Sequence, residues 1–299
     1  MKRRRIWVEL LPPEELGRPT TRALLARYAL EPIMALPPSR QTPAMRTALS
    51  ELAADGIPIG IWPLLHDADG YWLSTHNAAT FMARVDEALA FLAEIPVRTM
   101  AIDLEPPLAI SRALNEGDVA GPLIRALFTS MTPAVRSARH EGRARLMALT
   151  TSLRARGIET LAAILPPVLL DLDARHRPVQ AMLSTPLDPS ACDVVCPMMY
   201  TTMIAPLFPG RGMAIARHLL ALAARRLVAR RGTAGTSIGL GCVGLGKLGD
   251  EPIYADVAAL EADVRAATLA GATDLALFSL EGALGRREPE AWLRAFAEG

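Results

Sequence analysis

In the stretch RTMAIDLEPP, residues 98–107, an apolar run ends abruptly in two carboxylates and two prolines. We interpret it as a buried strand that delivers acid groups to its own carboxyl end. Asp103 and Glu105 are two residues apart, so on a strand they point to the same side, with Cα atoms roughly 6 to 7 Å apart. Two carboxyl groups this close titrate differently, which suits a division of acid and base roles. The alternative is that both acids start a loop, where they cap a helix or pair with arginines.

Strand-like and helix-like segments alternate along the whole chain around this stretch. Residues 98–107 supply the fourth strand, and the other predicted strands are 5–11, 32–36, 58–66, 160–165, 193–200, 237–243 and 274–280. The predicted helices are 21–29, 43–54, 78–94 after the cap-like Asn77, 133–157, 214–231, 254–270 and 288–297, with one short helix expected near Gln180. Thr132 and Pro133 give the fourth long helix a cap residue followed by proline at its first position.

Eight strand-then-helix units with mostly continuous apolar strands predict parallel pairing that is buried on both faces. We therefore predict a closed (β/α)8 barrel, with residues 1–299 forming a single domain. An open doubly wound sheet would need a nucleotide fingerprint after the first strand, whereas that strand ends in Glu9 and prolines. The long segment 108–132 after the fourth strand is a candidate lid.

Composition excludes several classes of partner. Lysine plus arginine (32) almost balances aspartate plus glutamate (31), so no net charge draws the protein to nucleic acid or an anionic membrane. Apolar runs end before the roughly 18 residues that a membrane span needs. The start, residues 2–11, is too short and too acidic for a signal-peptide core, so we expect a cytoplasmic location. The three cysteines lack the spacing of a disulfide framework or zinc site, and we expect buried free thiols.

The barrel prediction itself selects candidate site residues, because active sites of such barrels lie at the carboxyl ends of the strands. The selected residues are Glu9, His66, Asp103, Glu105, Tyr200, Glu281 and the glycine-rich segment after the seventh strand. If Asp103 and Glu105 face the barrel axis, the small residue Ala101 does too and leaves room above the packed layers. Cys196, Met198 and Tyr200 likewise share one face of the sixth strand. The alternative for Tyr200 is a strand-end aromatic with its hydroxyl in water.

Aromatic residues bound the size of the ligand. Trp62 and Trp72 flank the loop 66–72, which could form one wall of a pocket, although both rings could instead pack the loop onto the barrel. Long polysaccharide clefts use many exposed rings, and this chain has only four tryptophans and four tyrosines. This favours a small carbohydrate or glycoconjugate over a polymer.

A resemblance follows from two of these motifs. Asp103-Leu104-Glu105 on the fourth strand, together with Met198-Met199-Tyr200 on the sixth, resembles the family 18 glycoside hydrolases, the chitinase-like group. The resemblance implies that Glu105 protonates the glycosidic oxygen while the substrate's own N-acetyl oxygen attacks the anomeric carbon. It also implies that Asp103 and Tyr200 orient and stabilise the N-acetyl group. This substrate-assisted route is an exception to the two-carboxylate mechanism.

The sequence departs from the family pattern at several positions. Ala101 and Arg98 stand where the family motif has further aspartates, and Thr201 stands where an acid usually follows the tyrosine. The eighth strand offers Phe278 and Leu280 where the family commonly has tryptophan. A barrel that binds a carbohydrate without hydrolysing it is therefore an alternative, since the missing aspartates normally polarise the catalytic pair.

Two further alternatives concern other ligands. A divalent-metal-dependent sugar isomerase or hydrolase could take its ligands from Glu9, His66, Asp103, Glu105 and Glu281. A phosphate site could form at the glycine-rich segment 239–247, although no helix starts immediately behind it. Those glycines could instead thin the barrel wall under a ligand.

The prediction is thus a glycosidase acting on a small N-acetylated sugar. Glu105, Asp103 and Tyr200 form the catalytic set, and no cofactor or metal is expected. The predicted substrate-binding residues are Glu9, Trp62, His66, Met198 and Glu281.

Overall fold

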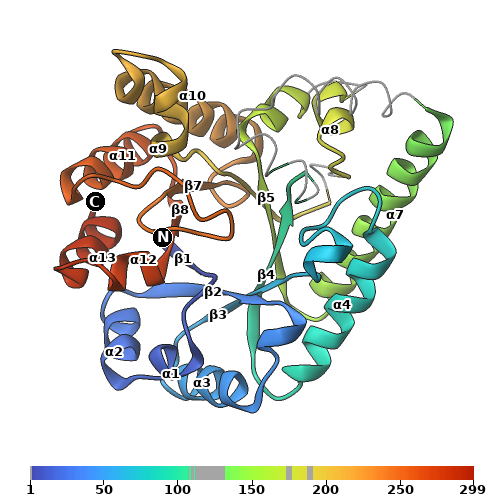
Figure 1. Cartoon of the computed structure of the whole chain (residues 1–299), viewed down its shortest axis with the longest axis horizontal. Coiled ribbons are helices and arrows are strands. Elements are labelled where there is room, and N and C mark those ends of the chain that lie inside the picture. Colours follow the sequence, from blue (N-terminus) through green and yellow to red (C-terminus); the bar gives the residue numbers. More distant parts are fainter. Residues whose placement is uncertain (1, 107, 109–110, 112–131, 173–176, 187–190) are drawn as a thin grey trace.

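The computed structural model describes residues 2–106, 108, 111, 132–172, 177–186 and 191–299, and it confirms the (β/α)8 barrel (Figure 1). The strands are β1 Arg3–Val8, β2 Leu30–Leu36, β3 Ile59–Pro63, β4 Val97–Leu104, β5 Glu159–Ile164, β6 Val194–Pro197, β7 Ser237–Gly241 and β8 Asp274–Phe278. All neighbouring strands pair in parallel in the order β6-β5-β4-β3-β2-β1-β8-β7. Single bridges at Val195–Thr236 and Met198–Gly239 join β6 to the β7 side and close the ring.

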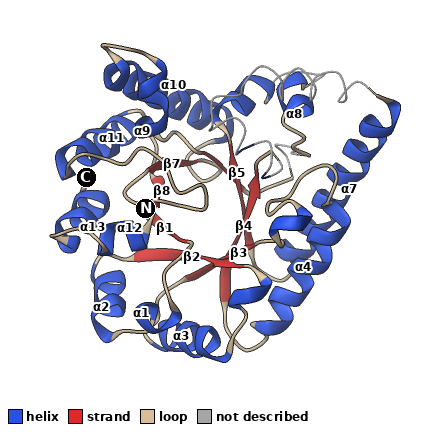
Figure 2. Ribbon diagram, in the orientation of Figure 1, coloured by secondary structure: helices blue, strands red, loops and turns tan. Residues whose placement is uncertain are grey.

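The helices form a layer outside the strands (Figure 2). The longer helices are α2 Pro19–Arg27, α3 Pro43–Ala54, α4 Ala78–Phe91, α7 Pro133–Ala155, α10 Gly212–Arg231, α11 Val257–Leu269 and α13 Pro289–Glu298. Shorter helices are α1 Pro13–Leu16, α8 Pro178–Met182, α9 Thr201–Ile204 and α12 Leu280–Leu284, with 3-10 turns η1 Pro38–Arg40, η2 Asp67–Asp69, η3 Pro166–Asp171 and η4 Ala205–Leu207.

Local chemistry explains where several elements begin and end. Thr132 caps α7 as predicted, because its hydroxyl accepts a hydrogen bond from the Val135 N–H, and Pro133 takes the first helical position. All strands except β2 end earlier than predicted, and local contacts explain the ends of β8 and β3. β8 ends at Phe278 because Ser279 caps α12, so the following residues turn into that helix. β3 ends at Pro63, since Leu65 already pairs with Tyr71 in the loop that follows.

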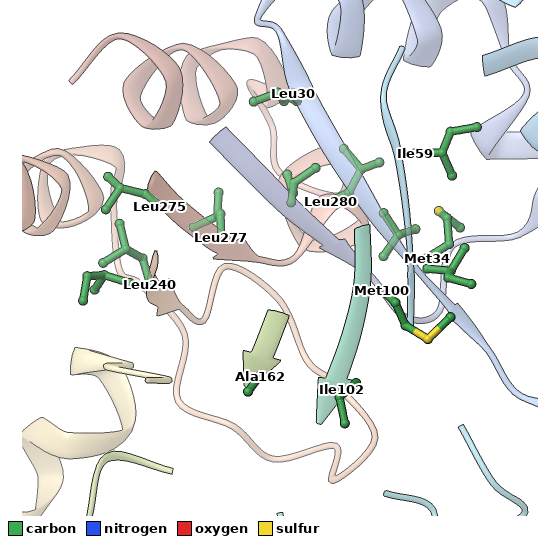
Figure 3. Packing of buried hydrophobic residues seen from close by; sticks show 14 of the residues in the cluster. Leu30, Met34, Ile59, Met100, Ile102, Ala162, Leu240, Leu275, Leu277 and Leu280 are labelled. Carbon is green, nitrogen blue, oxygen red and sulfur yellow. The ribbon is translucent and has the colours of Figure 1, made fainter. Parts of the chain in front are cut away.

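Strand parity separates two layers of side chains, as predicted. On β4, Met100 and Ile102 point to the helices and join the large apolar core between strands and helices. Figure 3 shows part of that core, with Met34, Met100, Ile102, Leu275 and Leu277 among its labelled side chains. Ala101 belongs instead to the cluster inside the barrel, together with Cys196 and Met198. Asp103 therefore faces the barrel interior, two residues further along the same strand.

A charged network fills the end of the barrel at which the strands begin. The Arg5 guanidinium is fully buried and lies 2.8 Å from Asp274, 3.0 Å from Glu159 and 3.8 Å from Glu31. Arg3 adds further contacts to Glu159 and Glu31. Arg3 and Arg5 of the basic start thus meet carboxylates from β2, β5 and β8, whereas the Arg4 guanidinium donates to backbone carbonyls of Phe296 and Thr273.

Three remaining expectations concern cysteines, membranes and the lid. Cys192, Cys196 and Cys242 are buried and are not disulfide-bonded, as predicted. None of the described helices combines the length and apolarity that a membrane crossing requires. The predicted lid, residues 108–132, lies outside the described residues except at Leu108, Ser111 and Thr132.

Candidate active site

A pocket opens at the carboxyl ends of the strands, where barrel enzymes carry their active sites. Its volume is about 170 Å³, compared with the roughly 10–15 Å³ that one water molecule needs, so it has room for a ligand of many atoms. The pocket is lined by Trp7, Glu9, Trp62, Trp72, Asp103, Glu105, Ala163, Leu165, Pro166, Met198, Tyr200, Met203, Ile204, Cys242, Lys247, Leu248, Glu251 and Phe278.

Asp103 and Glu105 form the chemical centre of this pocket. Asp103 is the penultimate residue of β4 and is buried, while Glu105 directly follows the strand and is partly buried. Their carboxyl groups share a hydrogen bond. Burial raises the pKa of Asp103 well above its ordinary value, and the neighbouring charges of Glu105 and Glu9 raise it further. Burial, with the charges of Glu9 and Glu251, also raises the pKa of Glu105. The pair therefore retains protons at pH values where ordinary carboxyl groups are ionised.

Tyr200 reaches the pocket from the end of β6, two strands away from β4 in the barrel. Its ring lies against β7, where Cβ atoms at Gly239 and Gly241 would be only 3.3 and 3.1 Å from ring carbons. The ring of Phe278 at the end of β8 is 6.0 Å away between centroids. The glycines of β7 thus thin the barrel wall, but they make room for the tyrosine ring that lines the pocket.

Glu9 lies just past the end of β1 and is almost fully buried in the pocket wall. Its carboxylate accepts hydrogen bonds from the Tyr71 hydroxyl at 2.9 Å and from the backbone N–H of Lys247 at 3.1 Å. Burial raises the pKa of Glu9 to about 7, and the charges of Glu281 and Glu251 contribute in the same direction. A neutral and an ionised form are therefore both accessible near neutral pH.

The loop after β7 supplies Glu251, a pocket residue that the sequence did not single out, beside Lys247 of the selected glycine-rich segment. The Glu251 carboxylate accepts hydrogen bonds from the backbone N–H groups of Gly246, Leu248 and Gly249 at 3.1 to 3.3 Å. Lys247 forms an ion pair with Asp67 at 3.0 Å and lies 4.8 Å from the centre of the Tyr71 ring. The signal in the sequence was an acid placed just behind a run of glycines, whose exposed N–H groups need acceptors.

Aromatic rings complete the walls. Trp62 of β3 lines the pocket as expected, and its ring meets that of Trp7 edge-on at 5.1 Å. The indole N–H groups of Trp7, Trp62 and Trp72 are buried without a hydrogen-bond partner among the described protein atoms. Met198, also expected, lines the pocket just past β6.

Two of the predicted substrate-binding residues do not line the pocket. His66 is exposed in the loop after β3, because that strand ends three residues earlier than predicted. Glu281 is on α12, where one carboxylate oxygen accepts hydrogen bonds from the backbone N–H groups of Glu9 and Leu10, each at 3.0 Å. Glu281 therefore fixes the end of β1 and, through it, the position of Glu9.

The two ligand alternatives from the sequence gain no support from the geometry. Across the described ranges, no three or more histidine, cysteine, aspartate and glutamate side chains are grouped so that they could hold a metal ion. In the glycine-rich segment, the N–H groups at 246–249 already face the carboxylates of Glu9 and Glu251. Because these acids occupy the donors that would receive a phosphate, the segment is a carboxylate-held loop.

Comparison with known proteins agrees with the architecture. No protein-family model and no curated protein matches the sequence. Among solved structures, the chain is similar to the glycoside hydrolase domain of PgaB (BpsB) from Bordetella bronchiseptica, with 15% identity, 99% of each chain covered and a TM-score of 0.59. A GH18 chitinase from Pseudoalteromonas aurantia has 12% identity, the same coverage and the same TM-score. A class V chitinase from Pseudomonas fluorescens has 12% identity, 99% coverage of each chain and a TM-score of 0.55. The chain thus has a divergent, chitinase-like barrel fold.

Proposed function

We propose that this protein is a glycosidase that hydrolyses a small N-acetylated sugar substrate by substrate-assisted acid/base catalysis. The observation that carries the proposal is the hydrogen-bonded pair of Asp103 and Glu105 in an apolar pocket at the catalytic end of a chitinase-like barrel. Pairs of carboxyl groups can hydrolyse glycosides by several mechanisms, and the contact between these two groups favours one of them.

The contact between the two carboxyl groups argues against a two-carboxylate mechanism for this pair. Carboxyl groups that flank a scissile bond are about 5 to 9.5 Å apart, depending on the stereochemical outcome. Asp103 and Glu105 are in hydrogen-bond contact, so they cannot act on opposite sides of one sugar ring. One carboxyl group then serves as acid and base, and the nucleophile comes from the substrate's N-acetyl oxygen.

Glu105 is the proposed proton donor to the glycosidic oxygen. It lines the pocket and is less buried than Asp103. Its raised pKa keeps the acid form present near neutral pH, which is the form that general acid catalysis requires. After bond cleavage, a water molecule attacks the anomeric carbon of the cyclised N-acetyl intermediate. The Glu105 carboxylate accepts a proton from this water, and the ring of the intermediate opens.

Asp103 and Tyr200 are the proposed partners of the N-acetyl group. Asp103 Oδ1 is buried without a hydrogen-bond partner among the described atoms, a costly arrangement that a substrate amide N–H would relieve. Tyr200 lines the same pocket, and its raised pKa keeps the hydroxyl protonated, so it can donate to the N-acetyl oxygen. The two contacts together would hold the acetamido group in line with the anomeric carbon.

The most useful experiment compares wild type, Glu105→Gln and Tyr200→Phe on a panel of aryl glycosides with and without an N-acetyl group, in the presence and absence of a chelator. We expect hydrolysis only of N-acetylated substrates, with retention of anomeric configuration by NMR and a loss of about 10²- to 10⁴-fold in kcat/KM for Glu105→Gln. Glu94→Gln, an exposed change of the same chemistry, serves as the control.

Three outcomes would redirect the proposal. Full activity in Glu105→Gln would exclude Glu105 as the acid. Loss of activity on chelation alone would favour the metal-dependent alternative. Binding of N-acetylated sugars by the wild type without any turnover would favour a carbohydrate-binding barrel.

A further inference from the structure

Two additional carboxyl groups enter the pocket from elements other than β4. Glu9 follows β1, and Glu251 belongs to the loop after β7, yet both line the pocket that contains Asp103 and Glu105. Ala101, the inward residue below Asp103 on β4, carries no charge. The acidic character of the pocket beyond the pair therefore comes from other parts of the barrel.

The hydrogen bonds around these two groups suit ionised carboxylates. Glu251 accepts from three backbone N–H groups of its own loop. A backbone N–H can only donate, so each contact requires an oxygen lone pair. Glu9 accepts from the Lys247 N–H through one oxygen and from the Tyr71 hydroxyl through the other. Both groups thus have donors that stabilise negative charge inside an apolar wall.

The carboxylates of Glu9 and Glu251 both approach the backbone of Gly246. A Cβ atom at this glycine would lie 2.9 Å from Glu9 Oε2 and 3.0 Å from Glu251 Oε1. It would also lie 2.7 Å from the ring of Phe278. The absence of a side chain at residue 246 therefore allows both acids to approach the same point of the loop.

We propose that Glu9 and Glu251 are positioning residues that hold negative charge in the pocket and thereby set the pH range over which Glu105 carries its proton. The inference rests on the proposed function of Glu105 as the acid. Glu9 at the end of β1 and Glu251 in the loop after β7 thus supply negative charge that Ala101 on β4 does not supply.

Several other groups face these carboxyls and contribute to the local charge. Glu105 shares the pocket lining with Asp103 of β4, Tyr200 after β6, Cys242 after β7 and the loop residues Lys247 and Glu251. Glu9 faces Tyr71, Lys247, Glu251, Glu281 and Arg40, whose guanidinium donates to the Glu9 backbone carbonyl. Lys247 is the cation among the described residues that line the pocket, but its ammonium group is engaged with Asp67.

The direction of the effect follows from like charges. An ionised Glu9 disfavours ionisation of Glu105, so removing the charge of Glu9 lowers the pH at which Glu105 loses its proton. Because Glu9 itself has a pKa of about 7, its charge is present in the alkaline range where Glu105 titrates. The acid form of Glu105 would then disappear at lower pH in a variant without that charge.

Glu9→Gln is the sharpest variant because it can keep both contacts. The amide oxygen can accept from the Lys247 N–H, while the amide nitrogen can donate to the Tyr71 hydroxyl, which also accepts. The experiment measures kcat/KM against pH on the aryl glycoside that the wild type hydrolyses best. In parallel, ¹³C NMR of labelled glutamate side chains follows the Glu105 carboxyl, assigned by its absence in Glu105→Gln. Circular dichroism confirms the fold, and Glu94→Gln removes a distant exposed charge as the matched control.

We expect Glu9→Gln to move both the alkaline limb and the Glu105 NMR midpoint down by about one pH unit, and Glu251→Gln to move them in the same direction. Glu94→Gln should move neither, because its charge is screened by solvent. An unchanged midpoint in a folded Glu9→Gln protein would overturn the inference, as would loss of activity at every pH with an unchanged midpoint. A shifted midpoint in a protein that hydrolyses no glycoside would support the electrostatic role while refuting the proposed function.

Discussion

Asp103 and Glu105 share a hydrogen bond between their carboxyl groups inside an apolar pocket. Such a contact needs a proton on one of the two oxygens, so it forms at pH values below the raised pKa values of the two groups. The arrangement is also destabilising at alkaline pH, because ionisation would place like charges together in a buried site.

This relationship predicts an unusual dependence of stability on pH. The pKa of Glu105 is raised in the folded chain, whereas the unfolded chain releases this proton near the ordinary value of 4.5. The folded state therefore binds more protons between these values, and the free energy of unfolding falls as pH rises through that window. Each pH unit within it costs about 1.4 kcal/mol. Urea unfolding at pH 5 and pH 8 should show Glu105→Gln gaining stability relative to wild type at the higher pH. A constant difference between the two proteins would contradict the assigned shift.

A second prediction concerns the residue after Tyr200. Asp263 of α11 is fully buried and accepts hydrogen bonds from Thr201, from the Tyr254 hydroxyl at 2.8 Å and from Arg217 at 2.8 Å. Because Thr201 is thereby fixed, Asp263→Asn should disturb the placement of Tyr200 and lower kcat/KM by about tenfold or more.

The control for Asp263→Asn changes Asp256, the residue that caps the same helix. Asp256→Asn keeps the cap of α11, since asparagine caps helices as well as aspartate does. It should leave kcat and KM unchanged. Equal kinetics in the Asp263→Asn and wild-type proteins would show that the buried contact to Thr201 does not position the tyrosine.

A third prediction concerns the opposite end of the barrel. Arg5→Met removes the guanidinium that faces Asp274, Glu159 and Glu31, two of which are buried. Uncompensated buried charge should cost about 3–5 kcal/mol in the free energy of unfolding. Arg145→Met removes an exposed partner of Glu141 and should cost within about 0.5 kcal/mol. Similar losses in both variants, measured by urea unfolding, would argue against the network.

Much of the fold could be predicted from the sequence because local signals agree with the tertiary structure. Continuous apolar strands alternating with helices indicate parallel pairing, and the two-residue spacing of Ala101 and Asp103 already places them on one face. Strand ends are encoded more weakly. The apolar run 58–66 predicts a strand that reaches His66, but β3 ends at Pro63 and leaves the histidine exposed.

The site could be predicted only where a strand itself delivers the residue. Asp103 lies near the end of a strand and Tyr200 follows one, so the strand pattern predicts both positions. Glu251 enters the pocket through hydrogen bonds to its own loop, and no periodicity encodes that fold-back. From the sequence alone, Arg5 looks like one residue of a basic N-terminal run. Its carboxylate partners are distant in sequence and reach it only when the barrel closes.

If Glu105 donates the proton to the leaving group, the effect of losing Glu105 depends on how much the leaving group needs that proton. The measurement is kcat/KM for wild type and Glu105→Gln on aryl N-acetylglycosides whose phenols differ in pKa. We expect the loss caused by Glu105→Gln to be large for a poor leaving group and to shrink towards none for dinitrophenol, which departs without a proton. A loss that is the same for every leaving group, or no loss at all, would contradict this role of Glu105.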